Sequence, residues 1–335
     1  MIRLMRLVVP LSNVKYYERL IKDGAGEFFA GFVPYEWLDQ YGMINPMNRR
    51  EFMLGSSQIC SMDAMVVLSK YVKYYGVKMK IAINSHYYLD EQYPVILDII
   101  EKLTNLGFDD FIIADLYLAI LIRERHINCK IHMSGEIETL NHHTINFLGK
   151  IDINRIVFPR KISLDDMQNC IKLNHTNIKE YEAFILNSLC KYSGGFCNSI
   201  HCDNLTATCS IPYVAQTYKD EETADTKVVE QINRMLLRSS MKDTIYHNGK
   251  FERKHIVGRT GCGICQVKKL NNIGITHLKI VGRGYDIDRL SNDVKLMSDI
   301  VKASYDIADD EFVNTVKAQY VYHDCSKCYY PLRND

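Results

Sequence analysis

The fold is decided by residues 77–115, which read VKMKIAINSHYYLDEQYPVILDIIEKLTNLGFDDFIIAD. Two apolar runs, VKMKIAINS (77–85) and DFIIAD (110–115), flank a segment over about 92–106 whose apolar residues recur with a helical period. Neither run alternates strictly between apolar and polar residues, which is typical of strands buried on both faces of a parallel sheet. This stretch therefore predicts a strand–helix–strand unit.

The same alternation continues along the chain and predicts eight strands in all. The other six are LMRLVVPL (4–11), GEFFAGFVP (26–34), KIHMSGE (130–136), NRIVFPR (154–160), EAFILNS (182–188) and THLKIVGRG (276–284). Helical segments lie between most of them, including 62–75, 138–148 and ISLDDMQNCIKL (162–173). Eight such units predict an α/β protein with a (β/α)8 TIM-like barrel, whose active site lies at the C-terminal ends of the strands.

Several predicted strands end in polar residues that would face the mouth of such a barrel. His132 is a candidate acid or base, and Arg160 and Arg283 are candidates for binding a carboxylate by bidentate hydrogen bonds. The alternative for each is a salt bridge, a satisfied core group or a cap on the following helix.

The regular alternation breaks between the seventh and eighth strands, where about ninety residues intervene. They include a helical segment near 227–238 and a turn, YHNGK (246–250), that predicts a hairpin. The predicted organisation is barrel units 1–7 over 1–189, a Cys-rich insertion over 190–265, the last barrel unit over 266–310 and a C-terminal tail with a C-x-x-C pair over 311–335.

Cysteines are concentrated in the insertion, which holds six of the eleven in the chain. These six are Cys190, Cys197, Cys202, Cys209, Cys262 and Cys265, and a further pair, Cys325 and Cys328, forms CSKC. A C-x-x-C pair presents both sulfurs to one metal, as in zinc and iron–sulfur sites. The spacing permits a four-cysteine cluster, a zinc site from the CGIC and CSKC pairs, or both. Cys129 and Cys170 lie in apolar periodic segments and are expected to be buried core residues.

The overall composition limits the classes of partner. The net charge of +1 means that a nucleic-acid partner would need a local basic patch. No segment approaches the roughly 18 apolar residues that a membrane span needs. The N-terminal residues do not resemble a signal peptide, so we expect a cytoplasmic protein whose cysteines are reduced or metal-bound.

The segment EAFILNSLCKYSGGFC (182–197) resembles the diagnostic motif of the peptidase U-thirty-two (collagenase-like) family. The residues at matching spacing are Glu182, Phe184, Ser188, Leu189, Cys190, Gly195 and Cys197. The stretches from KIHMSGE (130–136) to SLDDM (163–167) and CGICQVKKLNNIGITHLKIVGRG (262–284) also look like blocks of this family. Asn187 departs from the motif, which expects Gly, and Lys161 stands where many members have Glu.

The resemblance implies a [4Fe-4S] cluster held by Cys190, Cys197, Cys209 and Cys265. The remaining members of the cysteine-rich set, Cys202, Cys262, Cys325 and Cys328, would then be available for a second site. The resemblance also implies an activity. Family members that are characterised as enzymes perform or assist oxygen-independent hydroxylation of tRNA, rRNA or a quinone precursor, and prephenate is the hydroxyl source in some of them.

Three functions from different classes follow. The first, and the one we expect, is an iron–sulfur-dependent hydroxylase or related modification enzyme. The second is a peptidase acting on peptides, although the sequence contains neither H-E-x-x-H nor G-x-S-x-G. The third is a zinc-stabilised, non-catalytic barrel. The substrate would be a small molecule, a peptide or RNA, and the near-neutral charge favours a small molecule or a peptide over RNA. The expected partner is a protein or an electron donor.

Overall fold

A computed structural model describes most of the chain. The described residues are 5–42, 46–49, 57–190, 194–197, 227, 229–231, 245–247, 250–252, 256–321, 325 and 327–331. The chain divides into two compact units, of which one comprises Met1–Asn198 with Val257–Asp335 and the other comprises Ser199–Ile256.

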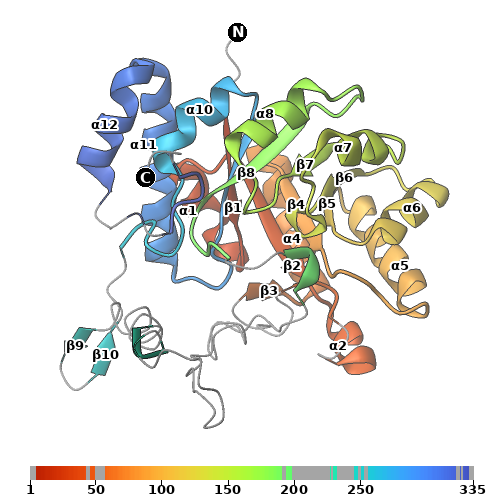
Figure 1. Ribbon diagram of the computed structural model, residues 1–335. Coiled ribbons are helices and arrows are strands. Elements are labelled where there is room, and N and C mark those ends of the chain that lie inside the picture. The colour runs from red at the N-terminus through yellow and green to blue at the C-terminus, as the bar shows by residue number, and fades with distance from the viewer. Residues whose placement is uncertain are drawn as a thin grey trace. The chain divides into compact units, whose positions relative to one another are not determined.

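The first unit is a closed barrel of eight parallel strands (Figure 1). In chain order these are β1 (Arg6–Pro10), β2 (Glu27–Phe32), β4 (Met79–Ile83), β5 (Asp110–Ile113), β6 (Lys130–Met133), β7 (Arg155–Val157), β8 (Glu180–Leu186) and β11 (His277–Ile280). Neighbours in sequence pair in parallel, and β1 closes the barrel because it pairs with both β2 and β11. The predicted (β/α)8 barrel is confirmed. Seven of the predicted strands contain the observed one, and β8 begins at Glu180, two residues before the predicted strand over 182–188.

A short ninth strand, β3 (Gln58–Ile59), lies at the mouth of the barrel. The pairing of β1 with β2 ends at Pro10 and Phe29, and β3 then pairs in parallel with the last two residues of β2. This strand was not predicted from the sequence, because two residues are too few to show a pattern. Its consequence is that the Gln58 side chain is held, buried, at the mouth.

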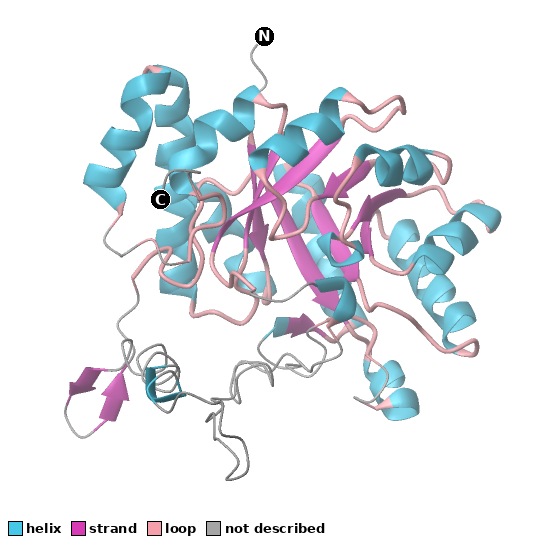
Figure 2. Cartoon of the chain, in the orientation of Figure 1, coloured by secondary structure: helices cyan, strands magenta, loops and turns pink. Residues whose placement is uncertain are grey.

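Helices surround the strands (Figures 1 and 2). They are α1 (Tyr17–Asp23), α2 (Tyr35–Tyr41), α4 (Met62–Tyr75), α5 (Gln92–Asn105), α6 (Leu116–Glu124), α7 (His142–Gly149), α8 (Leu164–Lys172), α10 (Val267–Asn272), α11 (Ile287–Asp306) and α12 (Asp309–Tyr320). Their apolar sides form the main core with the outward-facing side chains of the strands.

One predicted helix begins later than expected. A 3-10 turn, Gly135–Ile137, precedes the segment predicted over 138–148, which becomes helical only at His142. The reason is that Glu138 adopts a left-handed φ of 55°, which ends the turn, and Asn141 then caps α7 by accepting a hydrogen bond from the Thr144 amide. Asp115, at the end of the predicted strand over 110–115, caps α6. This residue therefore has the helix-capping role that is the alternative for polar residues at strand ends.

The interior of the barrel is charged, whereas barrels of this kind are usually filled by branched apolar residues. The buried ionisable residues on the eight strands are Glu27, Lys80, Asp110, His132, Arg155, Glu182, His277 and Lys279. Arg155 on β7 contacts Glu27 on β2 at 2.8 Å, and these strands are not neighbours in the sheet. The contact therefore crosses the barrel interior. A small apolar cluster of Val8, Phe29, Ala82 and Ile112 is separate from the main core.

The second unit contains a hairpin. Strands β9 (Ile245–His247) and β10 (Lys250–Glu252) pair antiparallel, which confirms the hairpin predicted at YHNGK. Of the helix predicted near 227–238, residues 227 and 229–231 are helical and the others lie outside the described residues. No helix in the described part of the chain has the length and apolar character needed to cross a membrane.

Candidate active site

Polar side chains gather at the C-terminal ends of the barrel strands. Glu136 follows β6, Arg160 follows β7, Cys190 follows β8 and Arg283 follows β11. A parallel barrel brings the ends of its strands together at one rim, and the loops there form the active sites of such barrels. We call this rim the barrel mouth. Of the predicted site residues, Arg160, Arg283 and Cys190 lie at it.

Arg160 is the best-defined cation of the mouth. Its Nη1 donates to Glu136 Oε1 at 3.3 Å, and its guanidinium lies 4.2 Å from the centre of the Phe184 ring. Burial disfavours the charge of Arg160, but the charges of Glu136, Tyr329 and Cys190 outweigh burial and raise its pKa. Arg160 is thus held as a cation between a carboxylate and an aromatic face.

A second arginine supports the same carboxylate. Arg49 Nε lies 3.7 Å from Glu136 Oε2, and Arg49 Nη1 donates to the carbonyl oxygen of Cys197 at 2.9 Å. Burial would raise the pKa of Glu136, yet Arg160 and Arg49 together lower it. Glu136 is therefore a carboxylate at neutral pH. His86 lies near Arg49 and Glu136, and its pKa is lowered by burial and by the Arg49 charge, so its imidazole is neutral.

Arg283 lies on a neighbouring part of the mouth and is buried. Its Nη1 donates to Asn48 Oδ1 at 3.3 Å, and Asn48 exchanges two hydrogen bonds of 3.1 Å with Gln58. A Cβ built on Gly31 would lie 1.8 Å from Gln58 Oε1 and 2.4 Å from Arg283 Nη1. Glycine at this position is what allows the β2 backbone to approach these two side chains.

His132 has a different location from the two arginines. It lies in the barrel interior, fully buried, with its Nε2 2.9 Å from Asp110 Oδ1. Burial, together with the Arg155 charge, lowers the pKa of His132 to about 4. The imidazole is therefore neutral at pH 7 and is not exposed to a ligand at the mouth. A catalytic role for His132 stays a prediction that this position does not favour.

The cysteines that the resemblance assigns to a cluster fall in separate places. Cys190 is in electrostatic range of Arg160, and the backbone of Cys197 is held by Arg49, so both belong to the mouth. Cys265 instead lies in electrostatic range of Cys325 and Cys328. Cys209 and Cys202 lie outside the described residues.

The side chains present satisfy a [4Fe-4S] cluster only in part. Thiolates are the correct donors, and two of the four implied ligands, Cys190 and Cys197, lie at the mouth. Among the described residues, however, no three His, Cys, Asp or Glu side chains are grouped so that they could hold a metal ion.

Several residues of the mouth and the interior were not predicted from the sequence. Asn48, Arg49, Gln58 and His86 lie in loops or in the two-residue strand β3, where no periodic pattern marks them. The interior charges had a visible signal, because single charged residues such as Lys80 and Glu182 interrupt otherwise apolar strand runs. A charge flanked by buried apolar residues on both sides has to point into the barrel or unfold the strand.

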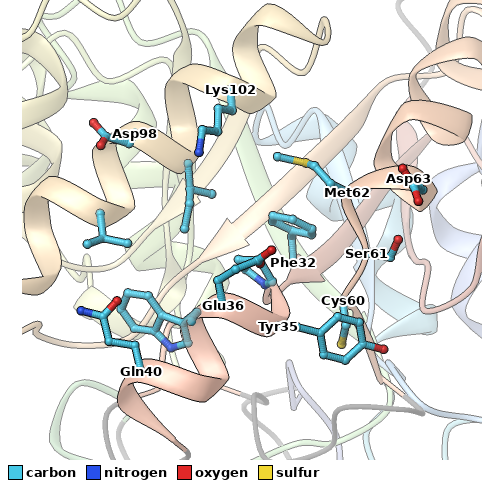
Figure 3. A pocket seen from close by; sticks show the side chains of 14 residues that line it. Phe32, Tyr35, Glu36, Gln40, Cys60, Ser61, Met62, Asp63, Asp98 and Lys102 are labelled. Atoms are coloured by element: carbon cyan, nitrogen blue, oxygen red, sulfur yellow. The ribbon is translucent and has the colours of Figure 1, made fainter.

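A separate cavity of about 680 Å³ lies beside the barrel (Figure 3). Lys102 and Asp98 line it from α5, whereas Tyr35, Glu36 and Gln40 line it from α2. Cys60 is also a lining residue, but the candidate site residues of the described chain are not. The cavity is therefore distinct from the mouth.

Comparison with known proteins gives two similar curated relatives. Both are named tRNA hydroxylation protein P. That of Escherichia coli (strain K12) is 22% identical over 305 residues, which cover 83% of this chain and 63% of the relative. That of Haemophilus influenzae is 25% identical over 132 residues, which cover 36% of this chain and 28% of the relative. The chain thus spans less than two thirds of the length of these relatives.

Solved structures resemble the barrel only loosely. The U32 peptidase Mk0906 matches with a TM-score of 0.42 and 9% identity over 55% of this chain and 70% of that one. A thiamine phosphate pyrophosphorylase from Pyrococcus furiosus matches with a TM-score of 0.44 and 7% identity over 90% of this chain and 98% of that one. The fold rests on the parallel pairing of the eight barrel strands.

A family model matches nearly the whole chain. The model is that of Peptidase family U32, and it covers residues 20–334, which include the barrel strands from β2 onward, the cysteine-rich segment and the C-terminal C-x-x-C pair. The motif at 182–197 falls within this match and supplies two residues of the mouth, Phe184 and Cys190. This chain belongs to peptidase family U32.

Proposed function

We propose that this protein takes part in the hydroxylation of tRNA and that the barrel mouth is its active site. The family membership and the two relatives named tRNA hydroxylation protein P support this assignment. Because the chain spans only 63% of the Escherichia coli relative, the activity of that whole protein is carried over here as a proposal.

The observation that carries the proposal is the position of Arg160. This cation lies at the barrel mouth against Phe184, is oriented by Glu136 and is in electrostatic range of Cys190. A guanidinium held in this way can bind a carboxylate or a phosphate through two parallel hydrogen bonds. Arg283, buried at the end of β11, provides a second cation on the same rim.

Each residue of the mouth has a role in this proposal. Arg160 and Arg283 bind the anionic groups of the substrate or co-substrate. Glu136 fixes the orientation of Arg160 and Arg49 through its two oxygens. His86 is neutral at pH 7 and so is able to accept a proton near these groups.

The cluster remains part of the proposal. We propose that Cys190 and Cys197 are two ligands of a [4Fe-4S] cluster at the mouth, as the motif implies. When bound, such a cluster supplies one-electron transfer or an open iron site for a substrate oxygen. Its presence is tested by quantifying iron and sulfide after anaerobic purification, with Cys190→Ala as the variant expected to lose both.

The function is tested in cells. Deleting the gene in its host should remove a hydroxylated nucleoside from total tRNA, as measured by mass spectrometry of digested tRNA. Wild type and Arg125→Lys, a control at an exposed ion pair with Asp98, should restore it. Arg160→Lys should restore about 10-fold to 100-fold less, because a lysine cannot form the paired hydrogen bonds.

Two outcomes would contradict the proposal. A tRNA nucleoside profile that the deletion leaves unchanged would exclude a role in tRNA hydroxylation. Peptides that accumulate in the deletion strain and are cleaved by the purified protein would favour the peptidase that the family name describes.

A further inference from the structure

The outer face of α4 carries exposed aromatic and basic side chains. Val67, Lys70, Tyr71 and Tyr74 are spaced three and four residues apart and so share one face of the helix. Val67 is 42% exposed, Tyr71 37% and Tyr74 81%, and Lys70 is exposed among them. The solvent face of a helix normally carries polar residues, and a row of apolar side chains on it is typical of a contact surface.

Further lysines border this row. Lys73 is exposed on α4, Lys78 follows the helix, and Lys15 lies on the 3-10 turn Val14–Tyr16, which packs against α4. Lys70 and Lys73 form no ion pair with any residue that the structure describes. The term α4 surface is used below for Lys15, Val67, Lys70, Tyr71, Lys73, Tyr74 and Lys78.

Two acids near the α4 surface already have partners. Glu18 Oε1 lies 2.6 Å from Lys22 Nζ, and this contact lowers the pKa of Glu18. Asp110, whose Oδ2 is 3.8 Å from Lys78 Nζ, is buried and also pairs with a histidine. Asp63 lies at the opposite end of α4, where it lines the cavity. The half of α4 that begins at residue 70 therefore presents positive charge to solvent.

The helix dipole does not explain this arrangement. A lysine in the last turn, such as Lys73, complements the partial negative charge at the C-terminus of a helix. The dipole gives no reason for Tyr74 to be exposed, or for Lys15 and Lys78 to lie on the adjoining segments. Lysines interleaved with exposed aromatic rings are instead the composition of surfaces that bind single-stranded nucleic acid.

We propose that the α4 surface binds the tRNA substrate outside the barrel mouth. Lys70, Lys73 and Lys78 contact backbone phosphates, and an unpaired base stacks on the ring of Tyr74. This inference rests on the proposed function, which provides the RNA substrate. It also explains how a chain with a net charge of only +1 binds RNA, because the positive charge is local.

The position of α4 suits this role. The helix begins at Met62, directly after β3 at the mouth, and ends at Tyr75. At 1.5 Å per residue, Tyr74 lies about 18 Å along the helix axis from Met62. RNA bound along α4 can therefore extend to the mouth, where its target nucleoside would react.

The test is tRNA binding by the full-length protein, purified without oxygen, over a series of salt concentrations. The double variant Lys70→Glu/Lys73→Glu should bind total deacylated tRNA about 10-fold or more weakly, and the slope of log affinity against log salt should become shallower by about 2. Tyr74→Ala should bind roughly 5-fold to 100-fold more weakly with the slope unchanged. Tyr74→Phe should bind like wild type, because stacking needs the ring and not the hydroxyl.

A control makes the same change of net charge elsewhere. Lys172 on α8 and Lys269 on α10 are exposed and form no ion pair within the described ranges of the chain. Lys172→Glu/Lys269→Glu should bind tRNA nearly as well as wild type, because salt screens charges distant from the RNA. Equal losses in the two double variants would assign the effect to net charge and overturn the proposal. Wild-type affinity in both Lys70→Glu/Lys73→Glu and Tyr74→Ala would overturn it as well.

Wild-type protein allows a measurement that needs no variant. Saturating tRNA should protect Lys70 and Lys73 from acetylation by a water-soluble ester, mapped by mass spectrometry, and should leave Lys172 and Lys269 reactive. Unchanged acetylation of Lys70 and Lys73 would contradict the proposal. These readouts measure binding alone, whereas the proposed function fails on an unchanged tRNA nucleoside profile in the deletion strain, so the two failures are distinguishable.

Discussion

Asn187 shows how a single residue shapes the mouth. It is fully buried with a φ of 69°, and Ser188 beside it has a φ of 51°. Left-handed backbone favours glycine, which is the residue that the family motif has at this position. Asparagine tolerates this conformation better than most residues. Here its amide donates to Asp293 Oδ2 at 2.8 Å and to the Val281 carbonyl at 3.2 Å, contacts that glycine cannot provide.

Two substitutions separate the backbone effect from these hydrogen bonds. Asn187→Gly and Asn187→Ala lose the same contacts, but only alanine is strained at positive φ. We expect Asn187→Ala to be less stable than Asn187→Gly by about 1–2 kcal/mol in chemical denaturation. Equal stabilities would mean that the backbone relaxes to negative φ in the alanine variant.

The site could be predicted at residue scale only in part. Arg160 and Arg283 were found because each directly follows an apolar run, and the ends of parallel strands meet at the mouth. His132 was placed in the same set, but it lies within β6 and the structure puts it beside Asp110 in the interior. Which level of the barrel a strand residue occupies depends on the register between strands, and a single sequence does not contain that register.

Elements with a strong periodic pattern were predicted well. The predicted helix over 62–75 agrees with α4 (Met62–Tyr75), because Ser61 caps its start and Gly76 ends it with a φ of 68°. The position of the C-terminal segment was not predictable in the same way. It is placed by Tyr329 and Tyr330, directly after CSKC, which donate hydrogen bonds to the backbone carbonyls of Asn187 and Phe184, about 140 residues earlier in the chain.

The tyrosines of this segment provide a prediction about its attachment. Tyr330→Phe removes the hydrogen bond to the Phe184 carbonyl and should lower the free energy of unfolding by about 1 kcal/mol. Hydrogen exchange in residues 325–330 should also become faster. Tyr74→Phe, at a residue that is 81% exposed, is the control and should change neither quantity. Unchanged exchange in Tyr330→Phe would mean that packing alone holds the segment.

At the scale of the whole molecule, the charged interior ties the strands together. Arg155 contacts Glu27 at 2.8 Å, Glu182 at 3.0 Å and Glu180 at 2.5 Å, while Lys279 contacts Glu182 at 2.7 Å and Lys80 pairs with Glu27. Burial opposes these charges, but Arg155 and its lysine neighbours lower the pKa of both Glu27 and Glu182. The network is costly to break because each partner would remain buried.

Arg155 is therefore expected to be essential for stability. Arg155→Leu should lower the free energy of unfolding by about 3–5 kcal/mol, since it leaves carboxylates buried without their main cation. Denaturant titration measures the change. Arg125→Leu, which removes an exposed ion pair with Asp98, should cost less than about 1 kcal/mol. A small effect of Arg155→Leu would show that water enters the barrel and solvates the carboxylates.

Acid should weaken the fold through His132. Its pKa is about 4 in the folded protein, where burial keeps it neutral, and about 6.5 when unfolded. Between these values the unfolded chain binds a proton that the folded one does not. Stability should therefore fall by up to about 3 kcal/mol as the pH is lowered from 6.5 to 4.

A variant isolates this contribution. His132→Gln should have a flatter dependence of unfolding free energy on pH between 6.5 and 4 than wild type. Some dependence should remain, because burial also lowers the pKa of His277. An identical slope in both proteins would assign the acid sensitivity to other groups.

The attachment of residues 329 and 330 to the end of β8 has a consequence for biosynthesis. Translation completes all eight barrel strands once His277–Ile280 has been made, yet Tyr329 and Tyr330 are added about fifty residues later. A nascent chain can thus close its barrel before the segment that attaches to the end of β8 has been made. Ribosomes that stall before this point would release a folded barrel with an unfinished mouth.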